Sequence, residues 1–423
     1  MDLKGKSQMK KTIKRNIFLY RDMKSLRYLY RIGHGPSSSH TMGPANAINL
    51  IKKQYNDASS FDVILYGSLA FTGRGHLTDK IIVDTAYPIP CNIHFNYDLE
   101  VEFPNTFDVT IHFVDKEDIT KRVLSLGGGA ISIDNEINHE DEEIYPEKNM
   151  DEIISLCKKN DWTFAQYVYE REGQSIKDYL KEVYKVMLDS IDRGLKSEGV
   201  LPGKLKVQRK AYKFLVAKHD HESMASYYNR ILAAYAFAVS EENASGGIIV
   251  TAPTCGACGT LPSVIKYMSS RCQSSEDEII DALATAGLFG NVVKTNGSIS
   301  GAEAGCQAEI GTATAMAAAA ACSLRRMNLD IIECAAEIAI EHSLGLTCDP
   351  VEGYVQIPCI ERNGVSAIKA TSASYIAEFI ADSQHISFDQ AVATALQTGK
   401  DMKMAYRETS QGGLAASYKK KGE

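Results

Sequence analysis

Long uninterrupted apolar runs and an excess of positive charge are both missing from this chain. The formal net charge is −7 over 423 residues, so the overall balance gives no support to nucleic-acid or anionic-membrane binding. The most apolar stretch, 302–322, is interrupted by glutamate, glutamine and threonine, which predicts a buried alanine-rich helix rather than a membrane span. The basic N-terminal residues contain no long apolar segment, so we expect no secretory signal peptide and a cytoplasmic location.

The chain also shows no sign of an oxidising compartment, which bears on its ten cysteines. In a reducing cytoplasm, cysteines are free, catalytic or metal-bound more often than disulfide-paired. We interpret five of them as small core residues, namely Cys91, Cys157, Cys272, Cys322 and Cys334.

The first third of the chain has the pattern of a mixed α/β domain. Apolar residues that alternate with polar ones predict strands at 61–70 and 106–115. A Gly-Gly-Gly break at 127–129 ends this region. The acidic stretch at 134–143 that follows is interpreted as a linker or a solvated loop, and as the domain boundary.

Helical signals dominate from about residue 150. An apolar stripe at helical spacing runs from Ile176 to Ile191, and capping-box pairs predict helix starts at Ser275, Asp330 and Ser387. There is no internal repeat and no coiled-coil pattern. We therefore expect an α+β fold with three parts: a basic extension over 1–22, a small α/β domain over 23–148 and an all-α domain over 149–423.

Three cysteines of the helical part stand at expected turns: Cys306, Cys348 and Cys359. Thiolates at turns can converge on one metal centre, and three of them on a four-iron cube would leave one iron without a protein ligand, open to act as a Lewis acid. The gaps of 42 and 11 residues match no compact ferredoxin pattern. From the residues alone, a metal site and three packed cysteines both remain open.

A serine-rich turn, GPSSSHT at 35–41, lies near the N-terminus. Hydroxyls and free backbone N–H groups in such a turn suit a carboxylate or phosphate, and a histidine there can transfer a proton. A serine-rich helix cap with a surface histidine explains the pattern equally well. The candidate substrate ligands are Ser37, Ser38, Ser39 and Thr41, and the candidate acid or base is His40.

Other polar residues have a functional and a purely structural interpretation. His76 ends the glycine-rich run YGSLAFTGRGH at 66–76 and is either an acid or base or a structural histidine. Lys294 is either a base or carboxylate anchor or a surface lysine. Cys255 and Cys258 form a Cys-x-x-Cys pair; because no second half-site accompanies it, a tight turn with small packing residues is favoured over a zinc or redox site.

Taken together, these segments resemble the iron–sulfur-dependent L-serine dehydratases, also called L-serine ammonia-lyases. The similarity extends from about residue 26 to residue 416. The motifs that carry it are GPSSSHT (35–41), YGSLAFTGRGH (66–76), SLGGGAI (125–131), EGVLPG (198–203), EENASGG (241–247), APTCGACG (252–259), SISGAEAGCQAEIG (298–311), GLTCDPVEG (345–353) and PCIERN (358–363).

The resemblance implies a lyase that converts L-serine to pyruvate and ammonia, with L-serine as its partner and neither nucleic acid nor membrane. It implies a [4Fe–4S] cluster held by Cys306, Cys348 and Cys359, an active site between the domains, and a homodimer as the family's assembly. Some single-chain relatives end in a cysteine that binds the remaining iron temporarily. This chain ends in Ala-Ser-Tyr-Lys-Lys-Lys-Gly-Glu, so that ligand is not expected, and many relatives lack a cysteine at Cys255.

Three other functions compete with this interpretation. A pyridoxal-phosphate serine dehydratase would need a Ser-x-Lys-x-Arg-Gly type of segment, which the sequence does not contain. A related iron–sulfur lyase for cysteine or threonine differs only in modest pocket contacts. A non-catalytic metal or redox sensor built on Cys255 and Cys258 would leave the serine and histidine loops unexplained.

Overall fold

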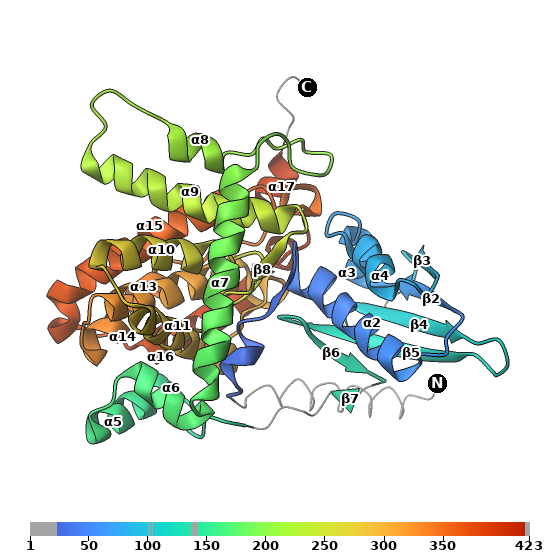
Figure 1. The fold of residues 1–423 in the computed structure, drawn as a ribbon, viewed down its shortest axis with the longest axis horizontal. Coiled ribbons are helices and arrows are strands. Elements are labelled where there is room, and N and C mark those ends of the chain that lie inside the picture. The colour runs from blue at the N-terminus through green and yellow to red at the C-terminus, as the bar shows by residue number, and fades with distance from the viewer. Residues whose placement is uncertain are drawn as a thin grey trace.

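The computed structural model describes residues 23–418 except 100, 102, 104, 135 and 138–142. The expected basic extension at 1–22 and much of the acidic stretch lie outside the described residues. Figure 1 shows a small sheet-containing domain beside a larger helical domain, which confirms the α+β fold expected from the sequence.

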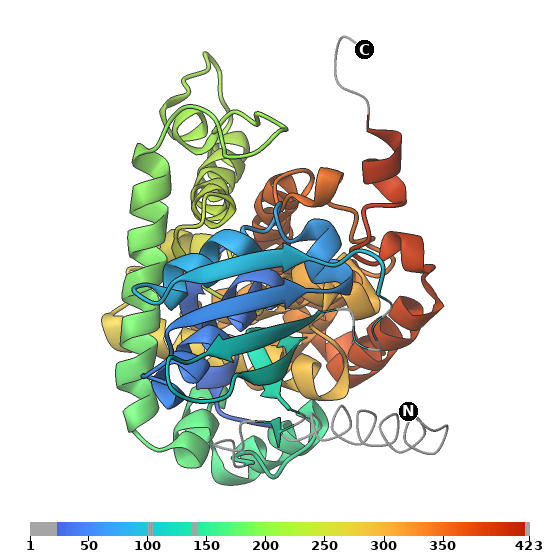
Figure 2. The same ribbon diagram turned by 90° about the vertical axis from the view of Figure 1, so that its right-hand side faces the viewer.

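The small domain is built on a six-stranded sheet in the order β3-β2-β4-β5-β6-β7, in which only β2 and β3 are parallel. Its strands are β2 (Ser60–Leu65), β3 (Cys91–Phe95), β4 (Thr106–His112), β5 (Ile119–Gly127), β6 (Ala130–Ile133) and β7 (Glu136–Ile137). Its helices are α2 (Gly43–Gln54), α3 (Gly67–Thr72) and α4 (Thr78–Ala86). Figure 2 looks onto this sheet, with the helical domain behind it.

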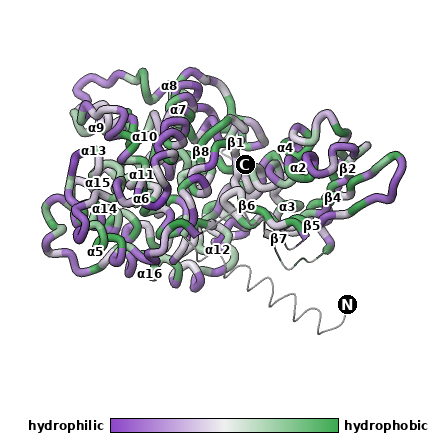
Figure 3. The backbone as a smooth tube through the Cα atoms, turned by 60° about the horizontal axis from the view of Figure 1, so that its bottom comes forward, coloured by the Kyte–Doolittle hydropathy of each residue, from purple (hydrophilic) through white to green (hydrophobic). Residues whose placement is uncertain are grey.

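One face of the sheet is covered and the other is solvated, as the alternation in the sequence requires. Phe61, Val63 and Leu65 of β2 are fully buried and share a core with α2, α3 and α4. The expected strand at 61–70 is too long, because Gly67 adopts a left-handed φ of 49° and turns the chain into α3. In Figure 3 the connection between β4 and β5 is hydrophilic, at the end of the molecule farthest from the helical domain.

The large domain consists of helices of very different length. They are α5 (Met150–Asn160), α6 (Phe164–Glu172), α7 (Ser175–Lys196), α8 (Ala211–Val216), α9 (Met224–Ala244), α10 (Thr260–Cys272), α11 (Glu276–Asn296), α12 (Gly301–Ala304), α13 (Thr312–Leu324), α14 (Leu329–Glu341), α15 (Cys359–Ile380), α16 (Phe388–Asp401) and α17 (Gly413–Ser417). Short π or 3-10 turns complete it: η2 (Leu26–Tyr28), η4 (Gln307–Gly311), η5 (Val351–Gly353), η6 (Ala381–Ser383) and η7 (Met404–Tyr406), while η3 (Ser38–Met42) packs on the small domain.

Helix α13 is the centre of this domain. Its sequence contains a run of five alanines, and all but one of its residues are buried against α10, α11, α14 and α15. Alanine favours the helix and lets neighbouring helices approach closely. The buried alanine-rich helix expected within 302–322 is therefore confirmed, although α12 and η4 interrupt its beginning. Within the part of the chain that the structure describes, no helix is long and apolar enough to cross a membrane.

The expected helix starts are right at two of three positions. Ser275 and Ser387 form complete capping boxes with Glu278 and Gln390. The start expected at Asp330 is wrong, because α14 is capped two residues earlier by Asn328, whose side chain accepts the Ile331 N–H at 2.9 Å. The apolar stripe of α7 is buried along its whole length.

The five cysteines interpreted as core residues occupy different depths. Cys157, Cys322 and Cys334 are fully buried in the core of the helical domain. Cys91 and Cys272 are only half-buried and lie at the edges of the two domains' cores.

The N-terminal segment joins the two domains. Met23, Leu26 and Tyr30 are buried in the core of the helical domain, although they precede the small domain in sequence. Strand β1 (Ile32–His34) then pairs antiparallel with β8 (Ile248–Val250), which follows α9. The chain therefore enters the small domain directly from the helical domain, and the loop after β1 lies between them (Figure 1).

Candidate active site

The serine-rich loop and the glycine-rich loop of the small domain contact each other. Ser38–Met42 form η3, and the Ser37 hydroxyl caps it by accepting the His40 N–H at 3.1 Å. The Thr41 hydroxyl donates to the backbone carbonyl of His76 at 2.7 Å. These two hydrogen bonds hold both loops in one place, so Ser37 and Thr41 use their hydroxyls inside the protein.

His40 is held at both ring nitrogens. Its Nδ1 lies 2.8 Å from the Ser39 hydroxyl and its Nε2 lies 2.9 Å from the hydroxyl of Ser68 on α3. The ring is buried, and burial together with the neighbouring His76 holds the pKa of His40 well below its ordinary value. His40 is therefore a neutral, oriented imidazole.

His76 lies beside His40 but has no such partners. The two ring centroids are 4.4 Å apart. His76 is 1% exposed, and neither of its ring nitrogens has a hydrogen-bond partner among the described residues. Burial lowers the pKa of His76 to about 4. Because buried polar groups are nearly always satisfied, two open nitrogens on one buried ring indicate a ligand position.

The two domains meet closely around these loops. An added Cβ at Gly35, just before the serine loop, would overlap Asn243 at the end of α9. The Asn243 side chain also donates to the Pro36 carbonyl at 3.0 Å. An added Cβ at Gly75 would lie 3.5 Å from the carbonyl oxygen of Gly353, in the turn that follows Cys348. The residue before His76 is therefore packed against the cysteine-bearing part of the helical domain.

The structure brings the three candidate cysteines together from separate segments. Cys306 lies just before η4, Cys348 lies between α14 and η5, and Cys359 is the first residue of α15. A hydrogen bond from the Cys348 thiol and the charge of Arg362 lower the pKa of the Cys306 thiol. The hydrogen bond to Cys306 and burial raise the pKa of the Cys348 thiol, and burial with the charge of Cys306 raises the pKa of the Cys359 thiol. All ten cysteines of the chain are free thiols.

Three cysteine thiols are the type of donor that an iron–sulfur cube takes. Among the residues that the structure describes, no three His, Cys, Asp or Glu side chains are close enough to hold one metal ion. A cube takes one thiolate at each iron, so its three ligands do not converge on one point. Three neighbouring thiols from three segments, with an arginine beside them, are soft donors of the kind that such a cluster takes.

Arg362, four residues into α15, organises the loop of Cys348. Its guanidinium donates to the Thr347 carbonyl at 2.5 Å and to the Asp349 carboxylate at 2.8 Å, on either side of that cysteine. Asp349 also accepts the Leu414 N–H at 2.8 Å. The cysteine loop is therefore fastened both to α15 and to the C-terminal segment.

The C-terminal segment also contributes a carboxylate. Cys348 N–H donates to the Tyr406 carbonyl at 2.8 Å, and Glu408 N–H donates to the Cys348 carbonyl at 2.7 Å. Burial raises the pKa of Glu408 to about 8 and that of Glu309, three residues after Cys306, to about 7. Two half-buried acids thus adjoin the three thiols.

The remaining candidates are Lys294 and the Cys255–Cys258 turn, and this turn packs against the cysteine site, since Ala257 shares an apolar cluster with Cys306 and Cys348. The Lys294 ammonium donates to the Tyr28 carbonyl at 3.1 Å, in the N-terminal segment that packs on α11. Cys255 and Cys258 are fully buried in an apolar cluster, and burial raises the pKa of both thiols. Neither thiol is easily deprotonated to the thiolate, which agrees with their interpretation as packing residues in a tight turn.

Sequence reasoning did not single out Ser68, Asn243, Arg362, Glu309 or Glu408. All five belong to ordinary helix or loop segments, and their roles arise from contacts over long sequence distances, such as the 28 residues between His40 and Ser68. The available signal was that all of them except Glu408 lie inside motifs that carry the family resemblance. Nothing in the local pattern distinguishes them from surface polar residues.

Fold and site together define a two-domain α+β protein in which a buried histidine pair of one domain meets a three-cysteine loop region of the other. Two family models match the chain: "serine dehydratase beta chain" over residues 25–86 and "serine dehydratase alpha chain" over residues 113–415. The chain belongs to the serine dehydratase family.

Curated relatives match over nearly their whole length. The L-serine dehydratase of Haemophilus influenzae is 37% identical, over 92% of this chain and 97% of the relative. That of Helicobacter pylori strain 26695 is 38% identical, over 93% and 99%, and L-serine dehydratase 1 of Escherichia coli K12 is 37% identical over the same shares. The regions matched by the two family models are therefore both present in this one chain.

Proposed function

We propose that this protein is an L-serine ammonia-lyase, which removes water and ammonia from L-serine to leave pyruvate. The observation that carries the proposal is the buried His76 ring with two open nitrogens, placed where the small domain packs against the cysteine loop. The family membership and the relatives' names support L-serine as the substrate.

Cys306, Cys348 and Cys359 are the residues that would hold a [4Fe–4S] cluster. When bound, the cluster supplies a Lewis acid that turns the 3-hydroxyl of serine into a better leaving group. Arg362 keeps the Cys348 loop in place through Thr347 and Asp349. Its positive charge also favours the thiolate form of Cys306.

The serine loop binds the substrate carboxylate in this proposal. Ser37 and Thr41 shape the loop, since their hydroxyls are engaged with His40 N–H and the His76 carbonyl. Ser38 then provides a hydroxyl donor for the carboxylate, and the Ser39 hydroxyl donates to it while accepting the Nδ1–H of His40. Hydroxyl and backbone N–H donors stabilise the negative charge of a carboxylate without bringing a further basic group to the site.

The proton chemistry is assigned to the histidine pair. His76 accepts the Cα proton at an open ring nitrogen, and the electron pair of that bond forms the Cα–Cβ double bond as the hydroxyl leaves. The product, 2-aminoacrylate, becomes an imine that water hydrolyses to pyruvate and ammonia. His40 orients His76 by ring contact and remains neutral. Lys294 has no part in this assignment, because its ammonium contacts Tyr28.

The decisive experiment is anaerobic purification followed by iron and sulfide counts, an absorbance spectrum and pyruvate release in the same sample. We expect about four irons per chain, a broad brown shoulder and release of pyruvate from L-serine. Iron-free protein that still deaminates serine would reject the cluster. Iron-loaded protein that acts on L-cysteine or L-threonine but not on L-serine would reject the substrate assignment.

A further inference from the structure

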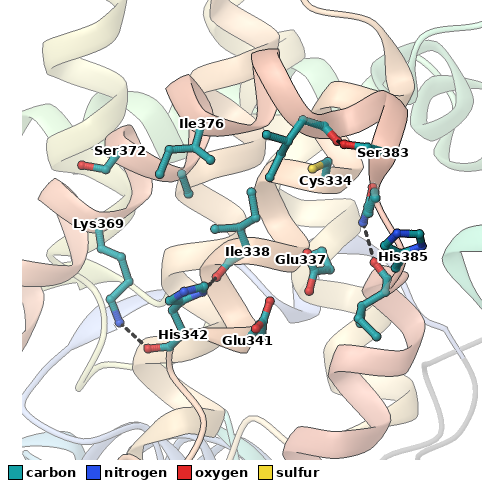
Figure 4. Close-up of a pocket in the computed structure, with 14 residues that line it drawn as sticks. Cys334, Glu337, Ile338, Glu341, His342, Lys369, Ser372, Ile376, Ser383 and His385 are labelled. Carbon is teal, nitrogen blue, oxygen red and sulfur yellow. Dashed lines mark hydrogen bonds between the residues drawn. The ribbon is translucent and has the colours of Figure 1, made fainter.

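A cavity lined by both polar and apolar residues lies in the helical domain, away from the candidate active site. It has a volume of about 540 Å³ and lies between α14, the C-terminal half of α15 and the segment 383–386 (Figure 4). Its wall is mostly apolar and includes Ile338, Ile376 and Ile380. The first lining residue on α15, Lys369, is ten residues from Cys359, about 15 Å along the helix.

The cavity contains a buried acid with an unpaired carboxyl oxygen. Glu337 lines it, is only 4% exposed, and its Oε1 has no hydrogen-bond partner among the described residues. Glu341, one helical turn further along α14, lines the same cavity, and Figure 4 draws the two carboxylates close together. Burial and the neighbouring Glu341 raise the pKa of Glu337 to about 8.

Lys369, the lysine that lines the cavity, does not pair with Glu337. The Lys369 ammonium also lines the cavity, but it donates to the His342 carbonyl at 3.0 Å and to the Ser343 hydroxyl at 3.2 Å, at the end of α14. Within the described part of the chain, neither Glu337 nor Glu341 forms a salt bridge. A buried carboxylate of this kind is expensive unless a positive partner reaches it.

We propose that this cavity binds a small organic ammonium ion with an apolar body. The ammonium group would lie against Glu337 and Glu341, and its hydrocarbon part would cover the isoleucine wall. Because Glu337 and Glu341 repel negative charge, the cavity disfavours binding of an anion. The apolar wall disfavours a bare metal ion, and among the described residues no three His, Cys, Asp or Glu side chains are placed to hold one. The proposal does not depend on the chemistry at the cysteine loop.

The test uses the full-length, cluster-loaded protein and three probes of equal chain length: n-pentylammonium, 1-pentanol and pentanoate. Binding is followed by ligand-observed NMR and titration calorimetry. We expect pentylammonium to bind at least tenfold more tightly than pentanol, and pentanoate not to bind. Glu337→Gln keeps the shape but cannot ionise to pair with an ammonium group, so it should weaken pentylammonium binding at least tenfold, with kcat/KM for L-serine unchanged.

Two further variants make the result specific. Glu182→Gln removes an exposed carboxylate from α7 and should leave binding unchanged. Ile376→Trp fills the cavity from its partly exposed rim and should abolish binding in a protein that still folds. Equal affinity for pentanol and pentylammonium, or equal binding by wild type and Glu337→Gln, would overturn the proposal. So would the absence of any pentylammonium binding at millimolar concentration.

Discussion

The imidazole rings of His40 and His76 lie 4.4 Å apart and are tilted by 39°. One ring is bonded at both nitrogens, to Ser39 and Ser68, while the other has two open nitrogens. The pair therefore separates two tasks, since one histidine is fixed by the protein and the other is available to a ligand. This difference, which comes from contacts across the fold, suggests how each histidine can be tested.

Replacing His76 should remove most of the activity. For His76→Asn we expect kcat/KM for L-serine to fall at least about 100-fold, because a positioned acid or base contributes 10²–10⁴-fold. Iron content should remain at the wild-type level. His94→Asn, at a histidine on β3 outside the covered face of the sheet, is the matched control and should keep full activity. A His76→Asn enzyme with near-normal turnover would remove His76 from the mechanism.

Ser68 is expected to position His40 without touching the substrate. Ser68→Ala leaves His40 Nε2 without its partner, and an unsatisfied buried group of this type costs about 1–3 kcal/mol. We expect kcat to fall roughly tenfold with KM little changed. Ser68→Thr should recover much of the loss, because it restores the hydroxyl.

The direct readout for Ser68 is the tautomer of His40 by ¹⁵N NMR, which a purely structural change would leave alone. Ser59→Ala serves as the control, because the Ser59 hydroxyl bonds the His112 carbonyl at the far edge of the sheet. An unchanged tautomer in Ser68→Ala would argue that Ser68 only fills space.

The buried histidines should make the fold sensitive to mild acid. The pKa of His76 is about 4 in the folded protein and about 6.5 when unfolded, so the unfolded state binds more protons between these values. Stability is therefore complete above about pH 6.5 and falls as the pH drops towards 4. The contribution of His76 is on the order of 3 kcal/mol.

This sensitivity is measured by urea unfolding at a series of pH values. His76→Asn should show a smaller loss of stability than wild type between pH 6.5 and pH 4. His40, whose pKa is also lowered by burial and by His76, remains in the variant and accounts for part of the remaining slope. Identical slopes for the two proteins would contradict a neutral buried His76.

Cys306, Cys348 and Cys359 should each be required for iron binding. For Cys306→Ala, Cys348→Ala and Cys359→Ala we expect loss of the brown absorbance and at least a 100-fold loss of pyruvate formation. Cys272→Ala, at a half-buried thiol on α10, should keep both. The measurement is iron and sulfide analysis of anaerobically prepared protein. Full iron content in any one of the three variants would remove that cysteine from the ligand set.

Much of the architecture could be predicted because its signals are local. Alternation gives β4 one buried face, a helical stripe buries one side of α7, and capping boxes begin α11 and α16. The errors have local causes too, since a left-handed Gly67 shortened one strand and Asn328 displaced Asp330 as a cap. Such features depend on residues a few positions apart, so they are visible in the sequence.

The sequence by itself determined the fold class and the chemical inventory: a hydroxyl-rich turn, two histidine loops and three cysteines at turns. Only the tertiary structure decided which groups act together. The open nitrogens of His76, the bond from His40 to Ser68 and the clamp of Arg362 around Cys348 join segments far apart in the chain. Their pKa values and hydrogen bonds depend on burial and on neighbours brought close by packing, and neither is encoded in local spacing.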